Sequence, residues 1–141
     1  MERFLNAQEQ MYNTALRELE AGKKTSHWMW YIFPQLRGLG KSLHAMYFGI
    51  ANLHEAKAYL AHPILGSHLR TCCKTLLTHK DKTAEEILGD LDAMKLRSSM
   101  TLFAAASDTD CVFHEVLRQF YHGQADAKTT AILMTQNTPR E

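Results

Sequence analysis

The sequence predicts an all-α fold, a compact single-domain bundle of about six to eight helices over residues 1–141 with no significant sheet. Three observations support this class. Apolar residues recur with helical period in most segments between breaks. Only 3 prolines and 7 glycines interrupt the 141 residues, and no linker or internal repeat marks a domain boundary. A hydrophobic content of 45% is enough to cover one core.

The first helix is defined by one apolar stripe. The stripe consists of Phe4, Leu5, Met11, Tyr12, Ala15, Leu16 and Leu19. Gly22 follows where a left-handed C-terminal cap would fall. Residues 28–33 are too few for periodicity to separate strand from helix. We expect a short buried helix there, because Ser26 suits an N-cap, Pro34 suits a terminator, and no second β-branched run could pair with a strand.

The middle of the chain contains several helix starts. Ser42 is expected to cap a second long helix that contains Leu43, Met46, Tyr47 and Ile50. Asn52 and Glu55 form a capping-box pattern for a third helix, which stops near His62. Pro63 suits the first turn of the next helix. The buried face of that helix is expected to contain Leu65, Leu69, Leu76 and one of Cys72 and Cys73.

The carboxyl-terminal half contains similar signals for the starts and ends of helices. Thr83 and Glu86 form a second capping-box pattern, and Gly89 closes this short helix. Asp90 is expected to cap a helix over residues 91–106, and Asp110 one over residues 111–121. A last helix is expected over about 127–134, followed by a frayed tail at about 136–141.

Composition excludes several classes of function. The 16 basic and 15 acidic side chains nearly cancel, which argues against nucleic-acid binding. No apolar run approaches the roughly 18 residues of a membrane span, and residues 1–10 are not a signal peptide. Three cysteines without a paired motif fit a reducing cytoplasm. The eight histidines contain no HExxH and no pair three or four residues apart, so we expect neither a metal site nor a cofactor.

An aromatic segment is the first candidate site. Trp28, Trp30 and neighbouring rings could form a stacking pocket for a planar ligand, with His27 and Gln35 at its rim. The alternative is that these rings form the centre of the core and that His27 is a hydrogen-bonded structural histidine.

A glycine-rich turn at residues 37–42 is the second candidate. It is not a P-loop, because Gln35 stands where the motif needs glycine and Pro34 interrupts the loop. Arg37 and Lys41, beside two glycines and a helix start, could still bind a phosphate or carboxylate without hydrolysing it. The alternative is a turn with solvated cations.

The third candidate is the segment at residues 95–103. Its side chains give a helix three faces that could pack against neighbours, so we expect other helices to surround it. Lys95 or Arg97 must then be paired or point into a polar cavity, where Arg97 could hold an anionic ligand beside Ser98. The alternatives are a salt bridge to Glu9, Asp90 or Asp92, and serines that allow close helix packing.

These segments resemble a bacterial family called domain of unknown function 1810. The resemblance rests on residues 26–36 (SHWMWYIFPQL), 38–40 (GLG), 95–103 (KLRSSMTLF), 3–9, 59–66 (YLAHPILG), 85–87 and Gly89. It implies a compact all-α fold and brings no activity, cofactor or catalytic residue with it. Some members are labelled calpastatin, but this chain has too many core-forming hydrophobic residues to be a disordered protease inhibitor.

The leading hypothesis is a cytosolic small-molecule binding protein or enzyme with a pocket for a planar, anionic, nucleotide-like ligand. Trp28, Trp30 and Gln35 would line the pocket, Arg97 would supply its charge, and Lys41 or Arg37 would lie at its mouth. The alternative is a non-enzymatic module that binds another protein through an exposed apolar patch.

Overall fold

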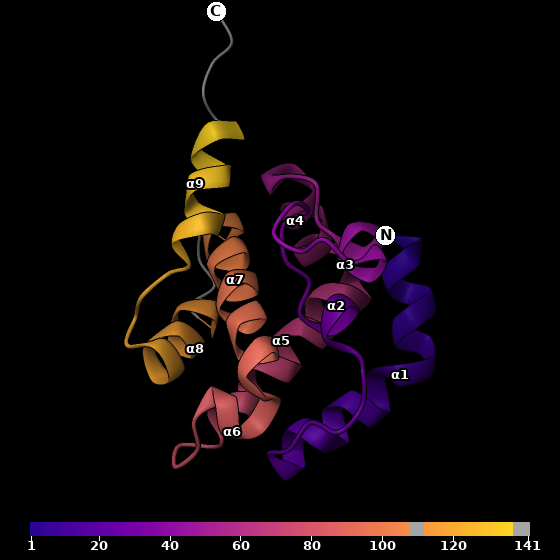
Figure 1. Cartoon of the computed structure of the whole chain (residues 1–141). Helices are drawn as coiled ribbons and strands as arrows, with labels where there is room; N and C mark the ends of the chain where they lie inside the picture. The colour runs from indigo at the N-terminus through magenta and orange to yellow at the C-terminus, as the bar shows by residue number, and fades with distance from the viewer. Residues whose placement is uncertain (108–111, 137–141) are drawn as a thin grey trace, which may run out of the picture.

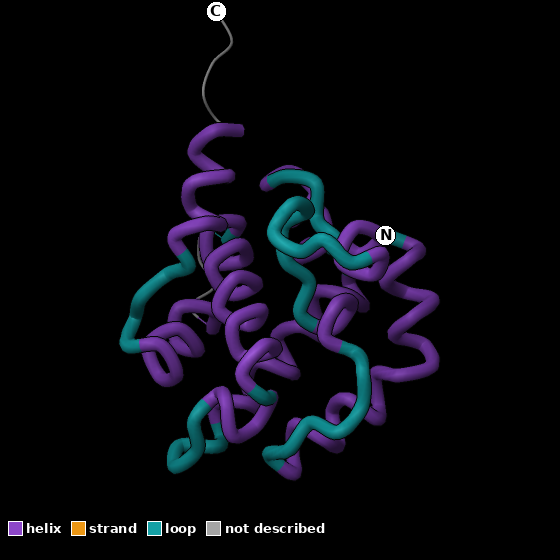
Figure 2. Tube along the Cα trace, viewed as in Figure 1, coloured by secondary structure: helices purple, strands orange, loops and turns teal. Residues whose placement is uncertain are grey.

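The computed structural model describes residues 1–107 and 112–136, and within them the chain is helical, with no strand (Figures 1 and 2). The predicted all-α class is confirmed. The described helices are α1 (Glu2–Ala21), α2 (Met29–Ile32), α3 (Leu43–Phe48), α4 (Leu53–Ala61), α5 (Pro63–Leu77), α6 (Ala84–Leu88), α7 (Asp90–Ala106), α8 (Val112–Tyr121) and α9 (Ala127–Gln136).

The first helix and its cap follow the sequence prediction. Gly22 ends α1 with a φ of 74°, and its backbone N–H bonds back to the last turn. The predicted short buried helix is α2, which ends at Ile32, directly before Phe33 and Pro34. The predicted Ser26 cap is wrong, because Trp28 occupies the N-cap position and α2 has no side-chain cap.

The prediction of a long helix reaching Ile50 is wrong. Ser42 caps α3 as expected, its side chain accepting from the Ala45 N–H, but α3 ends at Phe48. Ile50 instead forms a parallel bridge with Leu36. The Arg37 N–H donates to the Ile50 carbonyl at 2.8 Å, and the Ile50 N–H donates to the Gln35 carbonyl at 2.9 Å. Both bridge residues are buried. Ile50 is therefore apolar because it is buried at this bridge, and not because it lies on the buried face of a helix.

The two helices that follow pack closely against each other. Asn52 caps α4 by accepting from the Glu55 N–H, but the Glu55 carboxylate accepts from the Ala51 N–H, so the predicted capping box is only half formed. Gly66 of α5 lies against the last turn of α4, where an added Cβ would come within 2.2 Å of the Leu60 carbonyl oxygen. The buried face of α5 comprises Leu65, Gly66, Leu69, Cys72, Cys73 and Leu76.

Helix α7 is the surrounded central helix that the sequence predicted. It packs against α4, α6, α8 and α9, and Figure 1 shows it between α4 and the pair formed by α8 and α9. The capping box of Thr83 and Glu86 opens α6 as predicted. The predicted Asp90 cap is wrong, because Gly89, with a φ of 88°, is the N-cap and Asp90 is the first helical residue. Asp110 and Cys111 lie outside the described residues.

A buried amide joins four of these helices. Gln8 of α1 donates to the Tyr31 carbonyl at 2.7 Å and to the Tyr59 hydroxyl at 3.0 Å. Its side-chain oxygen lies 2.8 Å from Nδ1 of His68. Because the amide nitrogen serves as the donor, Nδ1 of His68 must carry the proton of this last bond. The network therefore holds α2 against α1, α4 and α5.

Candidate functional site

One carboxylate organises the loop that leads into α2. Oε1 of Glu18 accepts from the Thr25 N–H at 2.8 Å, the Ser26 N–H at 2.9 Å and Nε1 of Trp28 at 2.9 Å. Oε2 accepts from the Ser26 hydroxyl at 2.6 Å. Ser26 therefore binds the end of α1 instead of capping α2. Burial alone would raise the pKa of Glu18, but these hydrogen bonds outweigh it and lower the pKa from 4.5 to about 2.

The two tryptophans have different surroundings. Trp28 is 0% exposed and its indole N–H is bonded to Glu18, so its ring belongs to the core. Trp30 is only half-buried. Its ring stacks on the His44 imidazole with 4.6 Å between centroids. Of the two, Trp30 is the tryptophan that a ligand could reach.

Trp30 lines a groove between α2, the α6–α7 turn and the start of α7. The groove has a volume of about 360 Å³, near the lower end of the roughly 300–1,000 Å³ of ligand pockets. Its lining residues are Lys24, His27, Met29, Trp30, Leu88, Gly89, Asp90, Leu91, Asp92 and Lys95. The groove is therefore large enough for a ligand of mononucleotide size.

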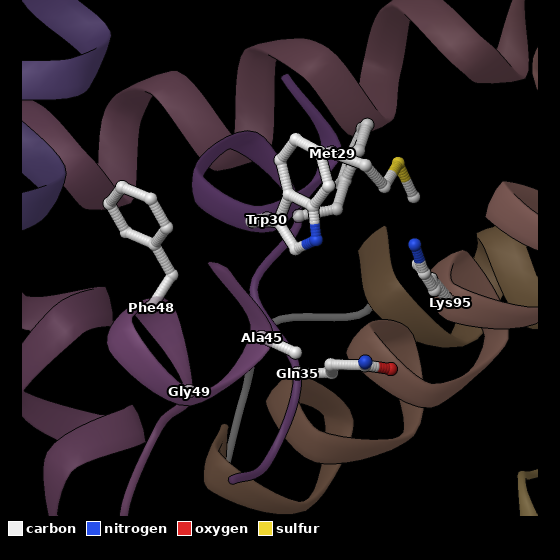
Figure 3. Close-up of a pocket in the computed structure, with 8 residues that line it drawn as sticks. Met29, Trp30, Gln35, Ala45, Phe48, Gly49 and Lys95 are labelled. Carbon is white, nitrogen blue, oxygen red and sulfur yellow. The ribbon is translucent and has the colours of Figure 1, made fainter. Parts of the chain in front are cut away.

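A small recess lies beside the groove and shares Met29, Trp30 and Lys95 with it. Gln35 and the α3 residues Ala45 and Phe48 complete much of its wall. In Figure 3 the Trp30 indole, the Lys95 amine and the Gln35 side chain face a common space. Its free volume of about 10 Å³ has room for no more than one water molecule.

Charge in the groove is concentrated on one triad. Asp92 lies 2.7 Å from the Lys24 ammonium and 3.4 Å from the Lys95 ammonium. Lys95 also lies 5.4 Å from the centroid of the Trp30 ring, within cation–π distance. Two cations share one anion in the triad, and Asp90 adds a second carboxylate to the same groove.

The start of α7 adds backbone donors to this triad. No side chain caps the helix, and its first residues, Asp90 to Asp92, line the groove. The first N–H groups of a helix have no partner within the helix and favour a negative charge. The groove thus combines an aromatic ring, two ammonium groups, two carboxylates and a helix start, so it offers both a stacking surface and charged partners to a ligand.

The structure brings together four of the residues proposed from sequence. Trp30, Lys95 and the exposed His27 line the groove, and Gln35 lines the recess. Lys95 pairs with Asp92, one of the acids considered as its partner. Sequence reasoning missed Lys24 and Met29 as lining residues, and no local pattern marks them, because they meet α7 only after folding.

The other proposed residues lie elsewhere. Arg97 donates to the carbonyls of Gln124 and Ala125, at 2.9 and 3.1 Å, and so fastens the α8–α9 loop. Ser98 bonds within its own helix, to the Met94 carbonyl at 3.3 Å.

Arg37 and Lys41, the two cations of the glycine-rich turn, line neither the groove nor the recess. Arg37 donates to the Gly49 carbonyl at 3.1 Å, and Lys41 is exposed. The hypothesis that Arg97 charges a pocket lined by Trp28 is therefore replaced by one in which Lys95 charges a groove lined by Trp30.

Two kinds of feature are absent from the described residues. No group of three or more His, Cys, Asp or Glu side chains there could hold a metal ion. None of the described helices combines the length and the apolar character that crossing a membrane requires.

The fold and groove define a small helical protein with a groove lined by an aromatic ring and charged side chains. Residues 1–133 match the family described as protein of unknown function (DUF1810), and the chain belongs to this family. Its structure is similar to that of the conserved hypothetical protein Rv1873 from Mycobacterium tuberculosis, with a TM-score of 0.93 and 46% sequence identity over 94% of this chain and 95% of the other. No protein with a curated description matches the chain.

Proposed function

We propose that this protein is a cytoplasmic small-molecule binder and that its ligand is a planar heterocycle carrying an anionic group. The observation that carries the proposal is the convergence of Trp30, the Lys24–Asp92–Lys95 triad and the uncapped start of α7 on one groove. The heterocycle would contact Trp30, and the anionic group would lie between Lys95 and the first N–H groups of α7.

The size of the groove indicates the size of its ligand. Its volume of about 360 Å³ suits a mononucleotide-sized ligand better than a dinucleotide.

The proposal predicts that AMP binds and that Lys95→Met weakens this binding about tenfold or more, because a charge-assisted hydrogen bond is lost. Isothermal titration calorimetry would measure the affinity of each protein for AMP, and for adenosine and ribose 5-phosphate as parts of that ligand. Lys95→Met should change adenosine affinity much less than AMP affinity, since adenosine has no anionic group.

Lys128→Met is the matched control, since Lys128 is an exposed lysine on α9. Equal AMP affinity in the Lys95→Met and Lys128→Met proteins would contradict the proposed position of the anionic group. Absence of AMP binding to the wild type would reject this ligand.

A second candidate, a protein-interaction module, is favoured by the surface of α3. Leu43, Met46 and Tyr47 are 83%, 55% and 60% exposed, although all three are large and apolar. If α3 contacts a protein partner, a Leu43→Ser and Tyr47→Ser double variant should lose that partner in pull-downs while AMP affinity stays the same. Unchanged partner recovery would exclude α3 as the contact surface.

A further inference from the structure

The charged and titratable side chains that line the groove fall into two groups. Asp92 pairs with both Lys24 and Lys95. His27 and Asp90 line the same groove, but neither side chain has a hydrogen-bond or ion-pair partner among the described residues. Asp90 is therefore the carboxylate of the groove whose oxygens are both free to accept hydrogen bonds from a ligand.

The backbone on either side of Asp90 is fixed to the loop before α2. The Lys24 N–H donates to the carbonyl of Ile87, just before the α6–α7 turn, at 2.7 Å. The Lys24 ammonium lies 2.7 Å from the Asp92 carboxylate, in the first turn of α7. One lysine thus holds the chain both before and after Asp90. The residue is positioned at the groove by the folded chain, so a ligand can bind it without moving a helix.

An unpaired carboxylate restricts which ligands fit the groove. A carboxylate accepts hydrogen bonds and donates none. A ligand that removes water from Asp90 must therefore supply hydrogen-bond donors, because a charged group that loses its partners costs free energy. A phosphate has only acceptors to offer and would be repelled by Asp90. The part of the ligand that lies beside Asp90 must therefore carry donors.

The position of Asp90 along α7 indicates which part of a nucleotide this is. Asp90 is the first residue of α7, and Lys95 follows about 7.5 Å further along the helix axis at 1.5 Å per residue. Lys95 lies at the Trp30 ring, where the heterocycle would bind. In a nucleotide the sugar connects the heterocycle to the phosphate. With the ring at Trp30 and the phosphate near the start of α7, the sugar would lie beside Asp90.

We propose that Asp90 accepts hydrogen bonds from the 2′- and 3′-hydroxyls of the ligand's sugar and so selects ribonucleotides over 2′-deoxyribonucleotides. This inference rests on the function proposed above. The two hydroxyls of ribose are adjacent, and each can donate to one oxygen of the same carboxylate. A 2′-deoxyribonucleotide leaves one of these oxygens without a donor.

The test is a calorimetric titration of AMP and 2′-deoxy-AMP into the wild type, Asp90→Ala and the control Glu2→Ala. The wild type should bind AMP about tenfold more tightly, since a hydrogen bond to a charged group contributes that much. Asp90→Ala should bind AMP more weakly than the wild type, and 2′-deoxy-AMP no more weakly, so that the two affinities become equal. Glu2 is an exposed acid in the first turn of α1, and Glu2→Ala should keep the tenfold preference.

The amino group of adenine is another donor that could reach a carboxylate. Purine riboside 5′-monophosphate lacks this amino group but keeps both hydroxyls, so the wild type should bind it as tightly as AMP. A weaker affinity that Asp90→Ala equalises would assign Asp90 to the ring and overturn its role at the sugar.

Two further results would overturn the inference and leave the groove as a binding site. One is equal affinity of the wild type for AMP and 2′-deoxy-AMP. The other is a tenfold preference for AMP that persists in Asp90→Ala, because another group would then recognise the 2′-hydroxyl. If none of the three nucleotides binds to the wild type, the proposed function and this inference are both rejected.

Discussion

Replacing Glu18 with alanine is expected to lower the free energy of unfolding by about 3 kcal/mol, because it leaves several donors without an acceptor. Those donors are the Thr25 and Ser26 N–H groups, the Ser26 hydroxyl and the Trp28 indole. Urea denaturation followed by circular dichroism would measure the loss. The control is Glu20→Ala, which removes an exposed carboxylate from the same helix. Equal losses in both variants would show that the Glu18 bonds contribute little.

The same carboxylate predicts a pH dependence with a definite sign. Its pKa is about 2 in the folded protein against an ordinary value of 4.5. As pH falls, the unfolded chain therefore takes up the proton first, and this favours unfolding. The contribution of Glu18 should be complete above pH 4.5 and disappear between pH 4.5 and about 2. Glu18→Gln should flatten the dependence of stability on pH in that window, and an unchanged slope would contradict the assignment.

Gly66→Ala is expected to destabilise the protein by about 3 kcal/mol, although alanine ordinarily stabilises a helix by about 1 kcal/mol relative to glycine. The added Cβ would lie 2.2 Å from the Leu60 carbonyl oxygen and 2.7 Å from the Arg70 side chain. The backbone contact cannot be relieved by a rotamer change, so α4 and α5 would have to separate. The midpoint of urea unfolding measures this loss.

Ser67→Ala is the neighbouring control, since Ser67 is exposed on the same turn. It should leave the unfolding midpoint nearly unchanged. If Gly66→Ala instead raises the midpoint, as helix propensity alone requires, the close approach of α4 and α5 is not a constraint on this position.

Two helices were predictable because their start or stop signals are local. The stripe of α1 with Gly22, and the Thr83–Glu86 box of α6, combine local signals that need no partner. Ile50 was misassigned because one buried apolar residue fits a helical face as well as a bridge. Asp90 was misassigned as a cap because Gly89 already ends one helix and starts the next.

The candidate site was predictable only in part, because it is assembled from segments far apart in the chain. Trp30 and Lys95 were noticed as unusual residues in their own segments. Their meeting depends on where α2 lies, which Glu18 and Gln8 of α1 help to fix through contacts that no sequence pattern marks. Arg97 attracted attention as a cation in an apolar helix, but two backbone carbonyls satisfy it.

The bridge between Leu36 and Ile50 joins the two ends of the segment that contains α3. Its two backbone hydrogen bonds close the base of a loop that contains α3. Phe48 is the residue of this loop that packs into the core, and changes at the exposed positions of the loop need not disturb the core. The loop is therefore the part of the protein in which substitutions could change binding specificity while the helical fold is retained.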